Sequence, residues 1–292
     1  MAAPMTAESA DGIILRSTPF SETSCVVTIF TRQFGKLRAL AKGAWRPKSA
    51  FDAALDLLSV CHVLVIRKSS GGLDLLTEAR LEQRFRCDST ILAFYGGMYV
   101  AELVDALTAD ADPHPELFDA VSRALFDLSS SASIASENVR CGFIDNNTSS
   151  EHRAKRAEKT DYDYNCARAR IVQAELDILR LSGHGASFSR CAECQASLEL
   201  HRRVAFGMLD GGSLCQNCRA GKRSIVSLSQ AAAGALVQLE SDPQCFRTIS
   251  MDDRTTGEIR AVMNTYISGI AGRKLKTAAF LNFRYFPRSH QT

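Results

Sequence analysis

The first 80 positions contain five short stretches that are rich in β-branched or aliphatic residues and separated by polar turn residues, a pattern typical of β-strands. The five stretches are residues 12–16, 25–31, 36–41, 60–66 and 73–79. Gln33, Phe34 and Gly35 predict a turn between the second and third, and residues 69–72 predict a hairpin between the last two. Because a small antiparallel sheet removes its exposed edges by closing on itself, we predict a five-stranded barrel.

After Arg84 the hydrophobic period becomes that of amphipathic helices. Ser89 is a suitable N-cap for the first of them. The segments with helical spacing are residues 91–107, 113–128, 167–182, 229–239 and 257–270. Residues 129–163 interrupt this pattern with serine clusters and a mixed-charge run, so we predict a loop or flexible insert there.

Two C-x-x-C pairs, Cys191 with Cys194 and Cys215 with Cys218, are separated by 20 residues. This spacing allows four thiolates to surround one metal ion, and the glycines at 211 and 212 suit a tight turn before the second pair. We predict one structural zinc ion, since four cysteines leave no open coordination position. Two disulfides or one redox-active pair are the alternatives. His184 or His201 could replace a cysteine ligand, but four cysteines already fill a tetrahedron.

These patterns predict an α+β multidomain protein. The predicted barrel covers residues 1–82, and a helical domain covers residues 83–187 and 224–292. A four-cysteine zinc finger at residues 188–223 interrupts the helical domain.

The composition is that of an ordinary soluble chain, with 292 residues, 46% hydrophobic and 23% charged. The six cysteines outside the two pairs follow no framework spacing, and the first ten residues lack the pattern of a secretion signal. We therefore expect a reducing cytoplasm, with association to the nucleoid if DNA is the partner. No apolar run approaches the length of about 18 residues that crosses a bilayer, so we expect no membrane partner.

Positive charge gathers at both ends of the chain although the net charge is only +3. Residues 16–48 hold seven cations and one glutamate, a local balance of +6, and residues 254–292 have the same counts. A polyanion bound to selected faces explains this distribution, while a solvated basic face is the plain alternative. The segment from residue 35 to 51 also carries Trp45 and Phe51, which could stack on bases or pack in a core. The candidate DNA contacts are Arg16, Arg32, Lys36, Arg38, Lys42, Trp45, Arg46 and Lys48.

No catalytic motif emerges from the sequence. The glycines at 207 and 212 have the spacing of a phosphate-binding loop, but Ser213 follows where the motif needs lysine. A zinc deaminase needs H-x-E upstream of P-C-x-x-C; His114 and Glu116 have the first spacing, but Arg190 precedes Cys191 where that motif has proline. We predict that the protein is not an enzyme, because no nucleophile, acid-base pair or open metal site can be named.

Several motifs resemble the RecO family of bacterial DNA repair proteins, and together they span most of the chain. They are residues 12–16, 20–24, 30–36, 41–49, 73–81, 113–118, 179–183 and 273–281, with the four paired cysteines. The resemblance implies an N-terminal OB-fold, a helical domain and a zinc finger without enzymatic turnover. It further implies binding and annealing of single- and double-stranded DNA, and action with RecR to help RecA displace single-strand binding protein. The insert at 129–163 departs from the family pattern.

For this family, basic residues near the C-terminus suggest a site for the acidic, Phe-ended tail of single-strand binding protein. The candidate cations are Arg273, Lys274 and Lys276, beside an apolar helical stripe through Tyr95, Tyr99, Leu103 and Leu107. Core packing is the more ordinary fate of such a stripe. A different class of function also stays open, a zinc-ribbon adaptor that docks proteins and touches nucleic acid incidentally; a salt-dependent gel shift separates the two.

Overall fold

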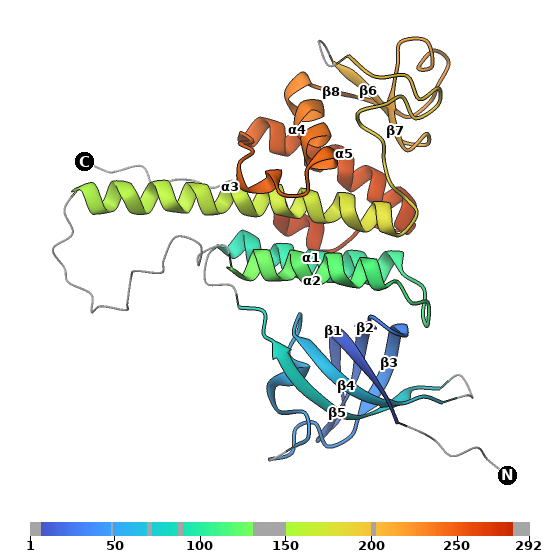
Figure 1. Ribbon diagram of the computed structural model, residues 1–292, viewed down its shortest axis with the longest axis vertical. Helices are drawn as coiled ribbons and strands as arrows, with labels where there is room; N and C mark the ends of the chain where they lie inside the picture. The colour runs from blue at the N-terminus through green and yellow to red at the C-terminus, as the bar shows by residue number, and fades with distance from the viewer. Residues whose placement is uncertain are drawn as a thin grey trace.

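The computed structural model describes residues 7–47, 49–68, 72–86, 90–130, 150–199 and 203–282. A closed barrel forms its N-terminal part, drawn in blue to teal in Figure 1. The strands are β1 (Ala7–Ser21), β2 (Ser24–Thr31), β3 (Gly35–Ala41), β4 (Val60–Ile66) and β5 (Asp74–Gln83), in the order β1-β2-β3-β5-β4. All neighbours are antiparallel except β3 and β5, which pair in parallel. The predicted five-stranded barrel is confirmed, and β1 is longer than predicted.

Alternation along the strands divides the barrel into an interior and an outer face. Ile14, Ile29 and Leu37 lie opposite one another across β1, β2 and β3, and they point into a buried apolar core. A short 3-10 helix, η1 (Asp52–Leu55), follows β3, and Phe51 before it packs into the same core. Core packing, the preferred role for Phe51, is therefore confirmed.

Five α-helices pack in layers above the barrel (Figure 1). They are α1 (Ile91–Leu107), α2 (Pro115–Ser130), α3 (Ser150–Leu181), α4 (Gln230–Ser241) and α5 (Asp253–Ala271), with 3-10 helices η2 (Cys245–Arg247) and η3 (Thr277–Asn282). The long helix α3 lies between the pair α1 and α2 and the pair α4 and α5. Thr90 is the N-cap of α1, since its hydroxyl accepts from the amide of Ala93, and the predicted cap Ser89 lies outside the described residues.

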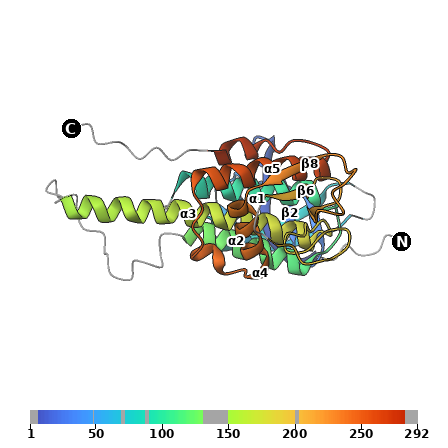
Figure 2. The ribbon, with the colours of Figure 1, turned by 90° about the horizontal axis from the view of Figure 1, so that it is seen from above.

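The predicted flexible insert at residues 129–163 is wrong for its second half. Helix α3 begins at Ser150, well before the predicted start at residue 167, and its N-terminal turns extend beyond the other helices (Figure 2). The run from 151 to 159 is rich in Ala, Glu, Lys and Arg, which favour helix on propensity even without an apolar stripe. Residues 131–149 lie outside the described part of the chain.

The stripe predicted on α1 contributes to the core of the helical domain. Tyr99 and Leu103 are fully buried, as core packing requires. The Tyr99 hydroxyl donates to the carboxylate of Glu175 on α3, which also pairs with the guanidinium of Arg260 on α5. This buried ion pair joins the three helices at the centre of the domain.

A small three-stranded sheet carries the predicted zinc segment. Its strands are β6 (Val204–Gly207), β7 (Gly212–Leu214) and β8 (Ile225–Leu228), in the order β7-β6-β8. The sequence pattern did not predict these short strands, and β8 lies wholly beyond the predicted boundary at residue 223. Ser229 follows directly as the N-cap of α4, so the sheet leads into the helical domain.

No helix in the described ranges combines the length and the apolarity that a membrane crossing requires.

The outer face of the barrel is partly covered by the helical domain. Ile13 and Phe30, opposite each other on β1 and β2, belong to the helical domain's core cluster, and the Phe30 ring centroid lies 6.0 Å from that of Phe118 on α2. Lys36 on β3 pairs with Phe30 in register and continues this row. The row of Ile13, Phe30 and Lys36 thus forms the interface with the helical domain, and the part of the outer face beyond this row is the open part.

Candidate metal centre and nucleic-acid interface

The four cysteines of the two C-x-x-C pairs converge on one point. Cys191, Cys194, Cys215 and Cys218 place their Sγ atoms within 4.8 Å of one another. The two pairs occupy similar turns, because the amide four residues after the first cysteine donates to that cysteine's carbonyl, at 2.9 Å in the first pair and 3.1 Å in the second. The predicted clustering of these four side chains is confirmed.

The separations fit a tetrahedral thiolate site. The Sγ atoms of Cys194 and Cys215 are 3.8 Å apart, close to the edge of a tetrahedron with metal–sulfur bonds of about 2.3 Å. Gly211 adopts a positive φ of 69°, and a Cβ on Gly212 would lie 2.7 Å from the Ser187 carbonyl oxygen. The chain can therefore turn tightly enough before β7 for the Cys215 amide to donate to the Cys191 sulfur at 3.4 Å.

The electrostatics of the cluster favour binding of a cation. Burial opposes ionisation of Cys191, but three neighbouring backbone amides donate to its sulfur and lower its pKa to about 6. Cys218 behaves in the opposite way, since its thiol donates to the sulfurs of Cys215 and Cys194 and its pKa rises to about 12. Four thiolates this close repel one another, so a central cation stabilises the fully ionised set. The four cysteines are positioned to bind a metal ion.

Neither candidate histidine joins this cluster in the described residues. His184 is exposed, and its carbonyl oxygen accepts a hydrogen bond from the Tyr266 hydroxyl at 3.1 Å. His201 lies outside the described residues.

The prediction of Lys36 as a DNA contact is wrong, because Lys36 does not lie on an open face of the barrel. Its outward side chain meets the C-terminal end of α1, where its side chain is only 10% exposed. The ammonium donates to the carbonyl oxygens of Asp105 at 2.8 Å and Thr108 at 2.9 Å, and it pairs with the carboxylates of Asp105 and Asp110. Alternation alone could not show that the helical domain covers this end of the strand.

Arg16 and Arg32 are exposed but paired with acidic residues of the helical domain. Arg16 donates to the Asp105 carboxylate at 3.2 Å. Arg32 forms a bidentate contact with Asp119, at 3.0 and 3.1 Å, which raises its pKa. These contacts join the barrel to α1 and α2.

The remaining candidate cations lie on the open part of the barrel. Arg38, Lys42 and Arg46 are exposed, and no carboxylate pairs with them within the ranges that the structure describes. Trp45 is in the same loop as Lys42 and Arg46 and is 55% exposed. Its amide donates to the Thr23 carbonyl at 3.1 Å, which holds this loop against the turn between β1 and β2. Lys48 lies outside the described residues.

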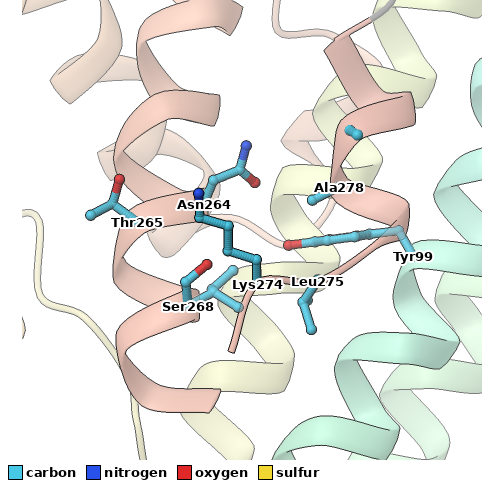
Figure 3. Close-up of a pocket in the computed structure, with 9 residues that line it drawn as sticks. Tyr99, Asn264, Thr265, Ser268, Lys274, Leu275 and Ala278 are labelled. Atoms are coloured by element: carbon cyan, nitrogen blue, oxygen red, sulfur yellow. The ribbon is translucent and has the colours of Figure 1, made fainter. Parts of the chain in front are cut away.

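Lys274, one of the predicted C-terminal cations, lines a pocket of about 410 Å³. Lys274 and Leu275 line one side, Asn264 and Ser268 on α5 line another, and Tyr99 reaches in from α1 (Figure 3). The Oδ1 atom of Asn264 is buried without a hydrogen-bond partner among the described residues.

Arg273 and Lys276 are held by an acidic residue that the sequence did not single out. Glu102 on α1 accepts hydrogen bonds from the Arg273 guanidinium, from the amides of Lys276 and Thr277, and from the Thr277 hydroxyl. Burial raises the pKa of Glu102, but these hydrogen bonds outweigh it and lower the pKa to about 2. The only signal for such partners was the overall charge balance, which required acidic segments between the basic ones.

Comparison with known families decides the relationship of the chain. The family model described as recombination protein O N terminal matches residues 5–85, and that described as recombination protein O C terminal matches residues 88–146 and 159–279. The chain belongs to the RecO family. This match confirms the resemblance that the sequence motifs predict. RecO proteins are recombination mediators in DNA repair.

Three RecO relatives align over 40% to 94% of the chain. The DNA repair protein RecO of Rhodopirellula baltica is 37% identical over 234 residues, which cover 80% of this chain and 74% of the relative. That of Bacillus mycoides is 27% identical over 278 residues, which cover 94% of this chain and 96% of the relative. That of Salinibacter ruber is 42% identical over 117 residues, 40% of this chain and 45% of the relative.

Proposed function

We propose that this RecO-family protein is a non-enzymatic mediator that binds single- and double-stranded DNA and anneals complementary strands. In this role it acts with RecR to help load RecA on DNA coated by single-strand binding protein. The observation that carries the proposal is the open part of the barrel, where Arg38 on β3 and Lys42 and Arg46 in the loop of the exposed Trp45 have no carboxylate partner among the described residues. Phosphates fit the cations, and an unpaired base fits the indole.

This surface also gives annealing a physical route. Two complementary strands repel each other through their phosphates, and neutralisation of those phosphates on one protein lowers the repulsion. Contacts to phosphate carry no base identity, so the surface accepts strands of any sequence. Base pairing between the strands then supplies the specificity.

The DNA surface is tested by reversing Arg38 and Lys42 together to glutamate. If three cations contact duplex DNA, log affinity falls with log salt at a slope of about −2.7, and the double variant should flatten the slope to about −0.9. Fluorescence anisotropy at several salt concentrations measures both slopes, and circular dichroism confirms folding. Arg80→Glu with Arg254→Glu is the matched control, because it makes the same change in net charge elsewhere. Equal slopes for the two double variants would place the DNA on another surface.

We assign zinc to the four-cysteine site, as a structural ion that holds the β6–β8 module. Zinc is the metal that thiolate tetrahedra most commonly bind, and four cysteine ligands leave no position for substrate. Metal analysis of freshly purified protein should find one zinc per chain. Less than half an equivalent of zinc with all four thiols reduced contradicts the assignment.

We place the acidic, Phe-ended tail of single-strand binding protein in the pocket beside Lys274. The ammonium suits a terminal carboxylate, the Tyr99 and Leu275 side chains suit the phenyl ring, and the unpaired Asn264 oxygen suits a peptide amide. Titration of a labelled tail peptide should show weaker binding to Lys274→Glu than to Lys276→Glu. The second variant is the control, because Lys276 lines a different pocket. Equal weakening by both variants would indicate a diffuse charge effect.

A further inference from the structure

The open part of the barrel's outer face contains a groove of about 520 Å³. Its floor follows the register of the strands, with Arg16, Thr28 and Arg38 in one row across β1, β2 and β3. Thr18 and Val26 form the next row, farther from the helical domain. Thr28 and Val26 are half-buried between longer neighbours, and their short side chains leave the hollow.

Phe20 forms the outer wall of this groove. Its side chain is 63% exposed and belongs to no hydrophobic cluster of the described residues. The pairing of β1 with β2 shifts between Pro19 and Ser21, so Phe20 is the extra residue of a β-bulge. Bulges redirect a side chain and occur often beside binding sites. The backbone therefore presents this ring to solvent at the edge of a concave surface.

The chemistry of the groove matches one nucleotide of an unpaired strand. Arg38 offers a guanidinium without a carboxylate partner among the described residues, which suits a phosphate. At the other end of the groove Arg16 and Lys36 are already neutralised by Asp105 and Asp110, so that end carries little free charge. An aromatic wall, two threonine hydroxyls and a nearly neutral inner end suit the flat, polar-edged face of a base better than a second phosphate.

We propose that Phe20 stacks on an unpaired nucleobase whose phosphate contacts Arg38, which makes the groove a selectivity element for single strands. This inference rests on the proposed DNA-binding function and assigns a subsite to it. The bases of a duplex are already stacked on their neighbours and cannot enter the groove. Phe20 therefore contributes to single-strand affinity and not to duplex affinity.

The test compares Phe20→Ala with Phe126→Ala in the full-length protein. Phe126 on α2 is 54% exposed, so its replacement removes a similarly exposed ring far along the chain. Anisotropy should show that Phe20→Ala weakens binding of a single-stranded oligonucleotide at least about fivefold, while duplex binding stays unchanged. Phe20→Trp should retain binding, and Phe126→Ala should match the wild type.

A strand with abasic sites separates stacking from a change of loop shape. If Phe20 contacts a base, the loss caused by Phe20→Ala disappears on an abasic strand, where no base is left to stack. An equal loss on normal and abasic strands, or on single strands and duplex, overturns the inference. A wild-type protein that binds neither substrate refutes the proposed function itself, whereas normal binding by folded Phe20→Ala refutes only this subsite.

Discussion

Replacement of Lys36 by alanine should destabilise the protein, although lysine on a barrel strand is usually a surface residue. The ammonium closes the C-terminal end of α1, where it donates to two carbonyl oxygens and pairs with Asp105. A cation at this end of a helix also interacts favourably with the helix dipole. Its removal leaves the carbonyl oxygens without this donor and leaves the Asp105 carboxylate with Arg16 as its remaining cation.

The expected cost follows from these contacts. Loss of one partner from a buried ion pair costs about 3–5 kcal/mol. Asp105 keeps Arg16 as a counter-charge, and the second carboxylate, on Asp110, is largely exposed and regains water, so we expect less, about 2 kcal/mol. Arg38→Ala is the matched control two residues along β3, because an exposed side chain without a partner should change stability by less than about 0.5 kcal/mol.

Urea unfolding followed by circular dichroism at pH 7 measures both variants. DNA affinity gives a second readout, since Arg38→Ala should reduce the duplex salt slope by about 0.9 and Lys36→Ala should leave it unchanged. Lys36→Ala should therefore lose stability and keep the salt slope, whereas Arg38→Ala should keep stability and lower the salt slope. If Lys36→Ala is as stable as Arg38→Ala, or if it alone alters the salt slope, the division of the barrel's cations into structural and DNA-binding groups is wrong.

Three further changes test other contacts of the fold. Glu102→Gln should cost about 1.5–3 kcal/mol of unfolding free energy at pH 7. Because the pKa of Glu102 is lowered from 4.5 to about 2, its contribution to stability is complete above about pH 4.5 and is lost toward pH 2. A cost in urea unfolding that is constant across this range contradicts the assignment. Glu175→Gln should cost about 3–5 kcal/mol, since Arg260 then stays buried without a counter-charge, whereas Tyr99→Phe should cost about 1 kcal/mol; equal costs in unfolding refute this ranking. Cys215→Ser should increase hydrogen exchange in residues 188–228 while barrel amides stay protected, and unchanged exchange there argues against a structural metal.

The barrel and the cysteine cluster could be predicted because their signals are local in the sequence. Strand β4 has the predicted bounds, and β2 begins one residue earlier than predicted. Alternation and turn residues fix such segments within a few positions. The metal site is equally local, since each C-x-x-C pair forms its own turn and only the return of β7 must bring the two together.

Partners of surface charges could not be predicted, because they depend on contacts distant in the sequence. Arg32 lies 87 residues before Asp119, and Lys36 lies 69 residues before Asp105. Charge patterns show where cations are dense, but they do not show which cations a folded neighbour covers. The early start of α3 was missed for a related reason, since a helix without an apolar stripe gives no periodic signal.

The position of each cation along the barrel strands determines its role. The row nearest the helical domain contains Phe30 and Lys36, and both are used to join the two domains. The next row contains Arg16, paired with the helical domain, and Arg38, which has no carboxylate partner among the described residues. Beyond it, Lys42 reaches solvent. Because the acidic helical domain neutralises one end of the basic face, a polyanion finds unneutralised charge only at the opposite end, where Phe20 and Trp45 are exposed.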